Sequence, residues 1–309
     1  MKNNSLPKVA ILILNWNNYQ DTKRCLDSLG KLSYPNFSIV LVDNGSTDKS
    51  DIKLKKEFQH IHHIKNNKNL GFAGGNNVGI RYILENNFPY FLLLNNDTEL
   101  IQPDFLTTLI KEIENEDLLG VIGPLVQRID GSNQDTILPF PTLGVTIKST
   151  LGLYNNDLSK KQYAESISGC CVLVRREVIK IAGLLDEYIF FYGEETEWFY
   201  RIRNAGWKIG YFPVKSIMHK GASSSTKIDD KMIYIERRSN VIYTLVKHNQ
   251  IFRAVMMYGL MNLMLIYRIL FKDRVSANRS EDNYPLNMIP EFYREVSRKW
   301  GYARNYVFE

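Results

Sequence analysis

The chain has 309 residues, of which 44% are hydrophobic and 23% charged, as in a globular protein with a full buried core of one large domain or two. Its net charge is +6, and the whole excess follows residue 230: residues 1–230 carry 26 basic and 26 acidic side chains, whereas residues 231–309 carry 13 and 7. This distribution gives no reason to expect a nucleic-acid partner and instead indicates a neutral body with a basic appendage that can face anionic lipid.

The cysteines and the apolar segments bear on the compartment. The chain has three cysteines, Cys25, Cys170 and Cys171, and two of them are adjacent. An odd number with this spacing is a poor basis for disulfide bonds and fits a reducing compartment. The segment 1–8 has no apolar signal region, and the apolar segment 254–267 is too short to span a bilayer. We therefore expect a cytoplasmic protein.

The first hundred residues alternate between apolar strands and helices. We expect strands at 9–14, 38–42, 61–64 and 90–94, and helices at 21–29, after residue 48, and from the glycine-rich segment 69–79 to about residue 86. Four alternations of this kind predict a parallel, doubly wound sheet.

The rest of the chain adds shorter elements and then becomes helical. We expect a helix at 103–117, strands at 119–127, 166–174 and 207–212, a short helix at 176–182, and a loop over 128–161. The sequence thus predicts an α/β domain at 1–230, with a mostly parallel sheet flanked by helices, and a helical basic extension at 231–309.

One segment of that extension is apolar on nearly every side. It covers 252–271 and is bracketed by Arg253, Arg268, Lys272 and Arg274. Such a helix must be buried in protein or in lipid. Peripheral attachment to the inner face of an anionic membrane and packing inside the protein both remain open.

Two classes of nucleotide-binding protein are excluded by their missing motifs. A dinucleotide-binding fold needs a Gly-x-Gly-x-x-Gly turn after the first strand, where this chain has Asn-Trp-Asn-Asn at 15–18. A P-loop needs Gly-Lys-Ser/Thr, which does not occur.

Polar residues follow several of the expected strands. Asn15, Asp43 and Asp97 each come directly after or close to the end of an apolar strand, and ligands of open α/β sheets bind at that edge. A carboxylate there can hold a divalent cation, which can hold a diphosphate, and Asp43 with its polar neighbours suits a nucleotide base and ribose. The glycine-rich segment 69–79 can present N–H groups to phosphate oxygens. The simpler interpretation is that these residues form turns and close helix packing.

A group of carboxylates follows aromatic residues in the segment 186–201. Glu194, Glu195 and Glu197 lie at an expected helix start, where the helix dipole favours the ionised form of a general base. The simpler interpretation is an acidic first turn with a Glu197–Arg201 pair on the surface.

Together these motifs resemble the family-2 inverting glycosyltransferases of the GT-A fold, most closely the bacterial branch that contains rhamnosyltransferases. The resemblance covers about residues 7–250. The matching pieces occur in the family's order: Asn-Trp-Asn at 15–17, Val-Asp-Asn-Gly-Ser-Thr-Asp at 42–48, the segment 69–77, Leu-Asn-Asn-Asp at 94–97, Glu-Glu-x-Glu-Trp at 194–198, Arg201 and His219.

The resemblance implies a role for each matching residue. A divalent cation, Mg²⁺ or Mn²⁺, would be held by Asp97 and His219, and Glu195 would be the general base, with Glu194 as the alternative. Glu197, Trp198 and Arg201 would face the acceptor. The donor would be bound by Asn15, Asp43, Asn44, Ser46, Gly71, Phe72, Gly75, Asn77, Asn95 and Asn96. The sequence departs from the family in having Asn95 in place of an aspartate, which leaves metal dependence open, and glutamate rather than aspartate at the base position.

The expected reaction is transfer of a sugar, rhamnose or another hexose, from a nucleoside-diphosphate donor to a hydroxyl of a bacterial surface-glycan or lipid-linked acceptor, with inversion. Two alternatives remain: a nucleotide-sugar-binding protein without catalysis, and a nucleotidyltransferase. The second would normally carry a glycine-rich, basic loop after the first strand, which is absent here. The oligomeric state stays open.

Overall fold

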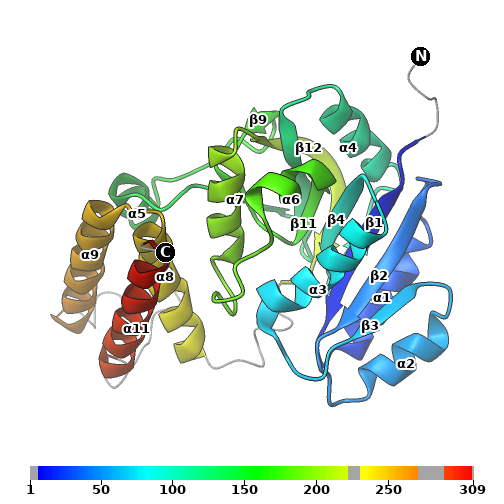
Figure 1. The fold of residues 1–309 in the computed structure, drawn as a ribbon. Helices are drawn as coiled ribbons and strands as arrows, with labels where there is room; N and C mark the ends of the chain where they lie inside the picture. Colours follow the sequence, from blue (N-terminus) through cyan, green and yellow to red (C-terminus); the bar gives the residue numbers. More distant parts are fainter. Residues whose placement is uncertain (1–5, 222–229, 271–288, 308–309) are drawn as a thin grey trace. The chain divides into compact units, whose positions relative to one another are not determined.

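The computed structural model describes residues 6–221, 230–270 and 289–307 (Figure 1). The chain forms two compact units: residues 1–140 with 156–227, and residues 141–155 with 228–309. The boundary near 228 lies close to the expected division at residue 230. The difference is the segment 141–155, which we expected within the first domain and which belongs to the second unit.

The first unit is built on a ten-stranded sheet whose main path runs β3-β2-β1-β4-β11-β6-β12-β5, with β7 paired to β6 and β9 to β12. The strands are β1 (Val9–Asn15), β2 (Phe37–Asp43), β3 (His62–Lys65), β4 (Tyr90–Asn95), β5 (Thr98–Leu100), β6 (Leu119–Arg128), β7 (Asn133–Gln134), β9 (Gln162–Tyr163), β11 (Cys171–Arg175) and β12 (Lys208–His219). Two short strands, β8 (Ile137–Leu138) and β10 (Ser166–Ile167), form a separate antiparallel pair.

The predicted parallel half of this sheet is confirmed. Strand β1 lies parallel to both β2 and β4, and β3 extends the sheet parallel to β2. Beyond β4 the direction changes, because β11 is antiparallel to both β4 and β6, whereas β12 is parallel to β6. All residues of β1 are buried to a large degree, as expected for a strand with both faces covered.

Helices cover both faces of the sheet (Figure 1). Alternate residues of β1 divide between the two cores: Val9, Ile11 and Ile13 pack on one face, and Ala10 and Leu12 on the other. The first face is covered by α1 (Tyr19–Leu29), α2 (Ser50–Glu57) and α4 (Phe105–Glu114). The second is covered by α3 (Gly71–Glu85), α6 (Arg176–Ala182) and α7 (Glu194–Asn204).

Several element boundaries differ from those expected. The expected loop over 128–161 contains β7, β8 and the helix α5 (Leu143–Thr150), and the expected strand at 166–174 is divided into β10 and β11. The last strand continues beyond Phe212 to His219. Its apolar pattern is interrupted because the pairing with β6 shifts register between Phe212 and Lys215, and such a bulge accommodates Pro213.

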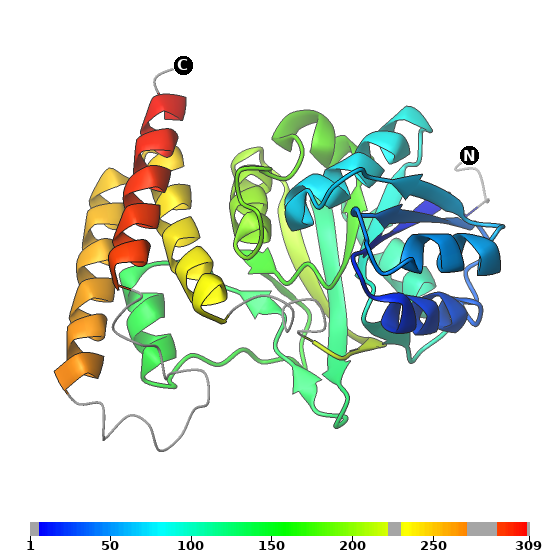
Figure 2. The same ribbon diagram turned by 90° about the horizontal axis from the view of Figure 1, so that it is seen from below.

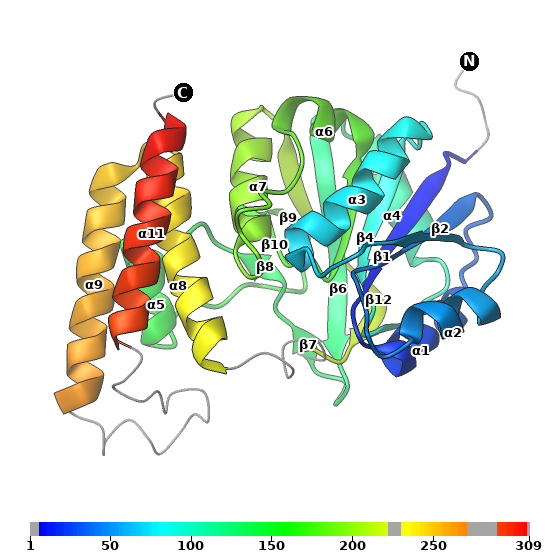
Figure 3. The same cartoon turned by 60° about the horizontal axis from the view of Figure 1, so that its bottom comes forward.

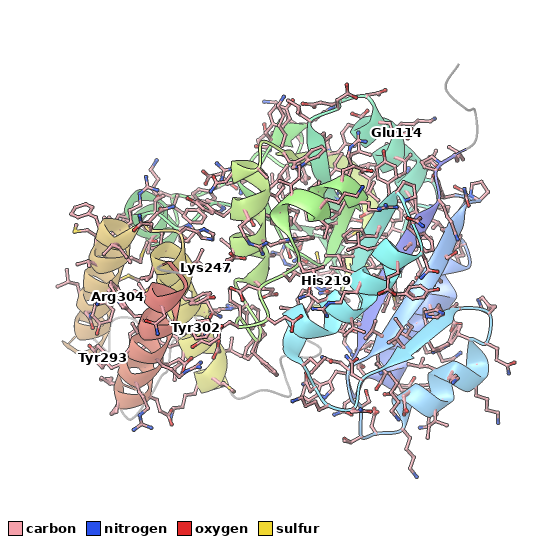
Figure 4. The ribbon with its side chains drawn as sticks, viewed as in Figure 1. Glu114, His219, Lys247, Tyr293, Tyr302 and Arg304 are labelled. Carbon is pink, nitrogen blue, oxygen red and sulfur yellow. The ribbon has the colours of Figure 1, made fainter. Side chains whose placement is uncertain are left out.

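The second unit consists of helices in the described part of the chain (Figure 2). They are α5, α8 (Asp230–Lys247), α9 (Ile251–Leu270) and α11 (Ile289–Val307). The fully buried Lys299 of α11 pairs with Glu236 of α8 at 2.6 Å and donates to the side chain of Asn240. Tyr293 and Tyr302 come from α11 (Figure 4), and the ring of Tyr302 lies near that of Tyr243 of α8. No helix in the described ranges is long and apolar enough to cross a membrane.

Candidate functional site

The carboxyl ends of β1, β2 and β4 bring the predicted polar residues to one edge of the sheet. Asn15 at the end of β1 lies opposite Asp43 on β2, and Leu14 lies opposite Asn95 on β4. Asn96 and Asp97 follow directly in the turn after β4. The expected strand-end cluster is therefore present.

Asn15 is a fully buried hub beneath this edge. Its amide nitrogen donates to Asp43 Oδ2 at 2.8 Å and to Ser50 Oγ at 2.9 Å, and its amide oxygen accepts from Thr22 Oγ1 at 2.8 Å. Since each bond ends on another residue of the fold, Asn15 orients Asp43 and the start of α1.

Asp43 and Ser46 form a turn whose polar atoms are largely paired. Asp43 Oδ1 accepts from the backbone N–H of Ser46 at 2.9 Å, and Ser46 Oγ accepts from the N–H of Asn17 at 2.9 Å. Asn44 is buried and donates its amide to Asn69 Oδ1 at 2.9 Å and to the carbonyl of Gly71 at 3.0 Å. The simpler interpretation as a turn therefore describes how this segment is held. Asp43 is buried at the strand end, and its contact with a nucleotide base stays a prediction.

The glycines of the 69–79 segment allow close packing at the start of α3. Gly71 has a φ of +75°, and a side chain there would clash with the carbonyl oxygen of Phe190, which also accepts from the N–H of Phe72 at 2.8 Å. A Cβ on Gly75 would lie 2.7 Å from Leu14 Cδ1. These glycines hold α3 against β1 and against the segment before α7.

Two further predicted donor residues are committed to internal hydrogen bonds. Asn77 donates to the carbonyl of Leu185 at 2.8 Å and to Glu187 Oε1 at 2.9 Å, and its oxygen accepts from the N–H of Leu185 at 3.0 Å. Asn96 donates to Thr22 Oγ1 at 2.8 Å. Asn77 therefore ties α3 to the segment that leads into α7, and Asn96 ties the turn after β4 to α1.

Asp97 and His219 meet across the strand pair β5–β12 (His219 is labelled in Figure 4). Asp97 Oδ1 lies 3.2 Å from His219 Nε2, and the two residues are only 9% and 8% exposed. The amide nitrogen of Asn95 lies 3.4 Å from the same ring nitrogen. Two residues that lie far apart in the sequence are thus in contact, and their role as metal ligands stays a prediction.

This pair has the chemistry and spacing of two metal ligands. In octahedral Mg²⁺ sites, oxygen ligands lie about 2.0–2.1 Å from the ion, so neighbouring ligands lie roughly 3 Å apart, close to the distance observed here. In the described ranges, no group of three or more His, Cys, Asp and Glu side chains could hold a metal ion. A cation at Asp97 and His219 would thus leave positions for phosphate oxygens and water.

Helix α7 begins at the carboxylates expected to supply the base. Glu194 is 5% exposed, and within the described part of the chain its Oε2 has no hydrogen-bond partner. Burial, and then the negative charge of Glu195, raise the pKa of Glu194 well above its usual range. Glu195 is half-buried, and its Oε2 has no partner in the described residues either.

The buried thiol of Cys170 is near enough to Asp97 and to Glu195 to feel the charge of both. Burial raises the pKa of its thiol to about 12, and the nearby charges of Asp97 and Glu195 both contribute. The carbonyl of Cys170 accepts from the N–H of Asn95 at 2.9 Å, which holds the start of β11 beside the end of β4. All three cysteines are buried and free, so their thiols are unreactive.

Glu197, Trp198 and Arg201 have a different setting from the acceptor side expected for them. Glu197 is fully buried and receives hydrogen bonds from Arg201 at 2.8–3.0 Å, so the expected surface pair is a buried one. The indole of Trp198 is buried and donates to the carbonyl of Gly183 at 2.9 Å. An acceptor could reach Glu197 or Trp198 only if this packing opened, so their contact with an acceptor stays a prediction.

Some residues that organise the site were not predicted from the sequence. Thr22 links Asn15 to Asn96, Ser50 receives a hydrogen bond from Asn15, and Gln134 contacts His219. Thr22 and Ser50 lie near the starts of helices that follow two site strands, a position that could have singled them out. Gln134 lies in a segment expected to be a loop and carries no local signal.

Residues 10–181 match the family model of glycosyl transferase family 2. Since this match spans more than half of the chain, the protein belongs to that family and is a glycosyltransferase. The family assignment favours this activity over the nucleotidyltransferase alternative.

Curated relatives and solved structures agree with this assignment. The chain is 26% identical over 242 residues to the low-salt glycan biosynthesis hexosyltransferase Agl10 of Haloferax volcanii, covering 77% of this chain and 75% of the relative. It is 24% identical over 258 residues to an N-acetylglucosaminyl-diphospho-decaprenol L-rhamnosyltransferase of Mycobacterium tuberculosis, covering 77% and 84%. The mannosyltransferase PcManGT from Pyrobaculum calidifontis, solved with GDP-Man and Mn²⁺, superposes with a TM-score of 0.61 at 12% identity over 96% of this chain and 88% of that one. The predicted GT-A fold is thereby confirmed.

Proposed function

We propose that this glycosyltransferase moves a sugar from a nucleoside-diphosphate donor to an acceptor hydroxyl, with inversion at the sugar carbon. The observation that carries the proposal is the Asp97–His219 pair at the carboxyl end of the sheet, in a chain of glycosyl transferase family 2. One side of this site suits a diphosphate, and the other offers a carboxylate to an attacking hydroxyl.

The donor would lie along the strand ends. Asp43 at the end of β2 would bind the nucleotide base, and the diphosphate would reach the turn after β4. A divalent cation, Mg²⁺ or Mn²⁺, held by Asp97 and His219 would neutralise charge that develops on the departing diphosphate. Most of the predicted donor residues support this arrangement indirectly, because they hold the loops that surround it.

Glu195 is the better candidate for the base. Glu194 is the more deeply buried carboxyl, and its pKa is raised by that burial, which disfavours its ionised form. Glu195, with its partly exposed side chain at the first turn of α7, would take the proton from the acceptor hydroxyl as that oxygen attacks.

The relatives narrow the expected substrates. Their names describe a hexosyltransferase of glycan biosynthesis and a rhamnosyltransferase that acts on a sugar-diphospho-decaprenol. We extend this to rhamnose or another hexose as the transferred sugar and to a surface-glycan or lipid-linked acceptor.

A lipid-linked acceptor fits an exposed apolar face on α9. Ala254 and Met257 are buried in the second unit, whereas Phe252 is 77% and Leu263 66% exposed, and Val255 and Met256 are also exposed. The spacing of these four exposed residues places them within one arc of the helix. We propose that this face attaches the protein to an anionic membrane surface. Lys272, Arg274 and the side chain of Arg268, which we expected to flank the segment, lie outside the described residues.

A panel of nucleoside-diphosphate sugars tests the function. We expect one of them, with Mn²⁺ and a sugar-diphospho-lipid acceptor, to yield nucleoside diphosphate and an extended glycan. Asp97→Asn, which keeps the side-chain shape, should lose this turnover, and a chelator should mimic it on the unmutated protein. Binding of donors without product from any of them would favour the catalytically inactive alternative. Full activity in chelator would contradict the cation.

A further inference from the structure

The ring of His219 has a polar partner at each of its two nitrogens, Asp97 and Gln134. Its Nε2 faces Asp97, and its Nδ1 lies 3.0 Å from Oε1 of Gln134. Gln134 is 85 residues away in the sequence and lies on the short strand β7.

A tight hairpin between β6 and β7 places Gln134 there (Figure 3). The N–H of Arg128 donates to the carbonyl of Ser132 at 2.8 Å, and the N–H of Gly131 donates back to Arg128 at 2.9 Å. Gln134 then lies opposite Val126 on β6.

The sheet register brings Gln134 to the same face as His219. Val126 lies opposite Ile217 on β12, and His219 follows Ile217 by two residues. Residues that pair across strands, and residues two apart along a strand, point to the same face. The contact between Gln134 and His219 is thus fixed by backbone pairing.

An amide oxygen can only accept a hydrogen bond, so the ring nitrogen that faces it must carry the hydrogen. Gln134 therefore keeps a hydrogen on Nδ1, so Nε2 is the ring nitrogen whose lone pair can bind a cation. The amide nitrogen of Asn95 lies 3.4 Å from Nε2.

Nε2 of His219 and Oδ1 of Asp97 lie 3.2 Å apart. With Nδ1 protonated, this gap can hold a hydrogen on Nε2, which makes an ion pair with the carboxylate, or a divalent cation, which takes the place of that hydrogen. Histidines that ligate metals commonly donate their second ring N–H to a neighbouring acceptor, which fixes the orientation of the ring.

We propose that Gln134 is a positioning residue for the cation: it holds His219 in the tautomer and orientation in which Nε2 coordinates the metal together with Asp97. This inference rests on the cation site of the proposed function. Gln134 itself lies outside the sequence motifs that contain Asp97 and His219.

Binding of Mn²⁺ alone, followed by the electron paramagnetic resonance signal of the free ion, tests the proposal without any turnover. Gln134→Leu keeps bulk and removes the acceptor, and it should weaken Mn²⁺ affinity by about 10- to 100-fold. Gln134→Glu retains an acceptor oxygen and should bind within a few-fold of the unmutated protein. Gln127→Leu is the matched control, because Gln127 belongs to the same hairpin and donates to Gly131; its affinity should be unchanged.

Long-range ¹H–¹⁵N spectra of the imidazole rings, with His219→Ala to assign the signal, report the tautomer directly. The metal-free protein should keep a hydrogen on Nδ1 whether or not Nε2 also carries one, the Mn²⁺-free ring being paired with Asp97, and Gln134→Leu should lose that preference for Nδ1. If Gln134→Leu binds Mn²⁺ as tightly as the unmutated protein while His219→Ala binds weakly, the positioning role is overturned and the cation site stands. If His219→Ala also binds normally, the cation site itself is misassigned.

Discussion

At the scale of single residues, the adjacent carboxyl groups of Glu194 and Glu195 have different surroundings in the site. Glu194 is buried beside a negative neighbour, and both effects raise its pKa, whereas Glu195 is partly exposed at the edge of the site. Two groups of the same chemistry can therefore hold different protonation states at one pH. A carboxyl that is held toward its protonated form, as Glu194 is, is the poorer candidate for a base.

Exchanging each carboxyl for an amide tests this division. Glu195→Gln keeps the shape and removes the basicity, so sugar transfer should fall by about 10²- to 10⁴-fold. Donor affinity should be nearly unchanged, because the base acts in the transition state. Glu194→Gln should have a much smaller effect on transfer, since burial already disfavours the ionised form of Glu194. A crippled Glu194→Gln beside an active Glu195→Gln would move the base by one residue.

The same burial predicts a pH dependence of stability. The pKa of Glu194 in the folded protein is raised above the ordinary value of 4.5, so the folded state keeps a proton that the unfolded state releases. Below pH 4.5 the protonated Glu194 makes its full contribution to the free energy of unfolding. That contribution is lost as the pH rises from the pKa of the unfolded state through the raised pKa of the folded state. The loss is about 1.4 kcal/mol for each unit by which these two pKa values differ. Urea unfolding at several pH values should show a smaller loss for Glu194→Gln than for the unmutated protein. Glu85→Gln, at an exposed position on α3, is the control and should follow the unmutated protein.

At the scale of elements, the approach of α3 to the segment before α7 depends on Gly71. A methyl group there would meet the backbone of Phe190, which has little room to move, and would also occupy a positive φ. The two effects can be separated with Gly206, which has a φ of +88° and open space around it. Gly206→Ala should cost about 1 kcal/mol from backbone strain, and Gly71→Ala roughly 1–3 kcal/mol more from overpacking. Equal losses in thermal or urea unfolding would show that the contact is unimportant.

At the scale of the whole molecule, the sequence predicts those structural features that depend on a local pattern of residues. The strands β1, β2 and β4 are continuous apolar runs that end in polar residues, so their parallel arrangement and shared edge follow from the pattern. The antiparallel β11 and the long β12 depend on pairing between distant segments, which leaves no local mark. For the same reason His219 and its pairing with Asp97 are recognised only through the family motif, although Asp97 itself is marked by its place after an apolar strand, and Gln134 is not recognised at all.

The second unit limits how membrane attachment can be tested. Truncation near Asn249 would remove α9 and α11 and leave α8 without the partner of Glu236, so the buried residues Ile242 and Leu245 of α8 would lose their cover. Substitutions on the exposed face of α9 keep the helices in place and are the better test.

We expect the full chain to sediment with anionic liposomes and to dissociate as salt rises, because basic residues near such a surface contribute about 1 kcal/mol each. Phe252→Ser, Val255→Ser and Met256→Ser combined should abolish sedimentation and leave nucleotide binding intact, since all three side chains are exposed on α9. A matched control replaces three exposed apolar residues of the first unit by serine, Ile52, Leu118 and Ile129. If the control lowers sedimentation as much as the α9 variant, the effect is general surface hydrophobicity. If the unmutated chain ignores anionic liposomes, the exposed face of α9 has another partner.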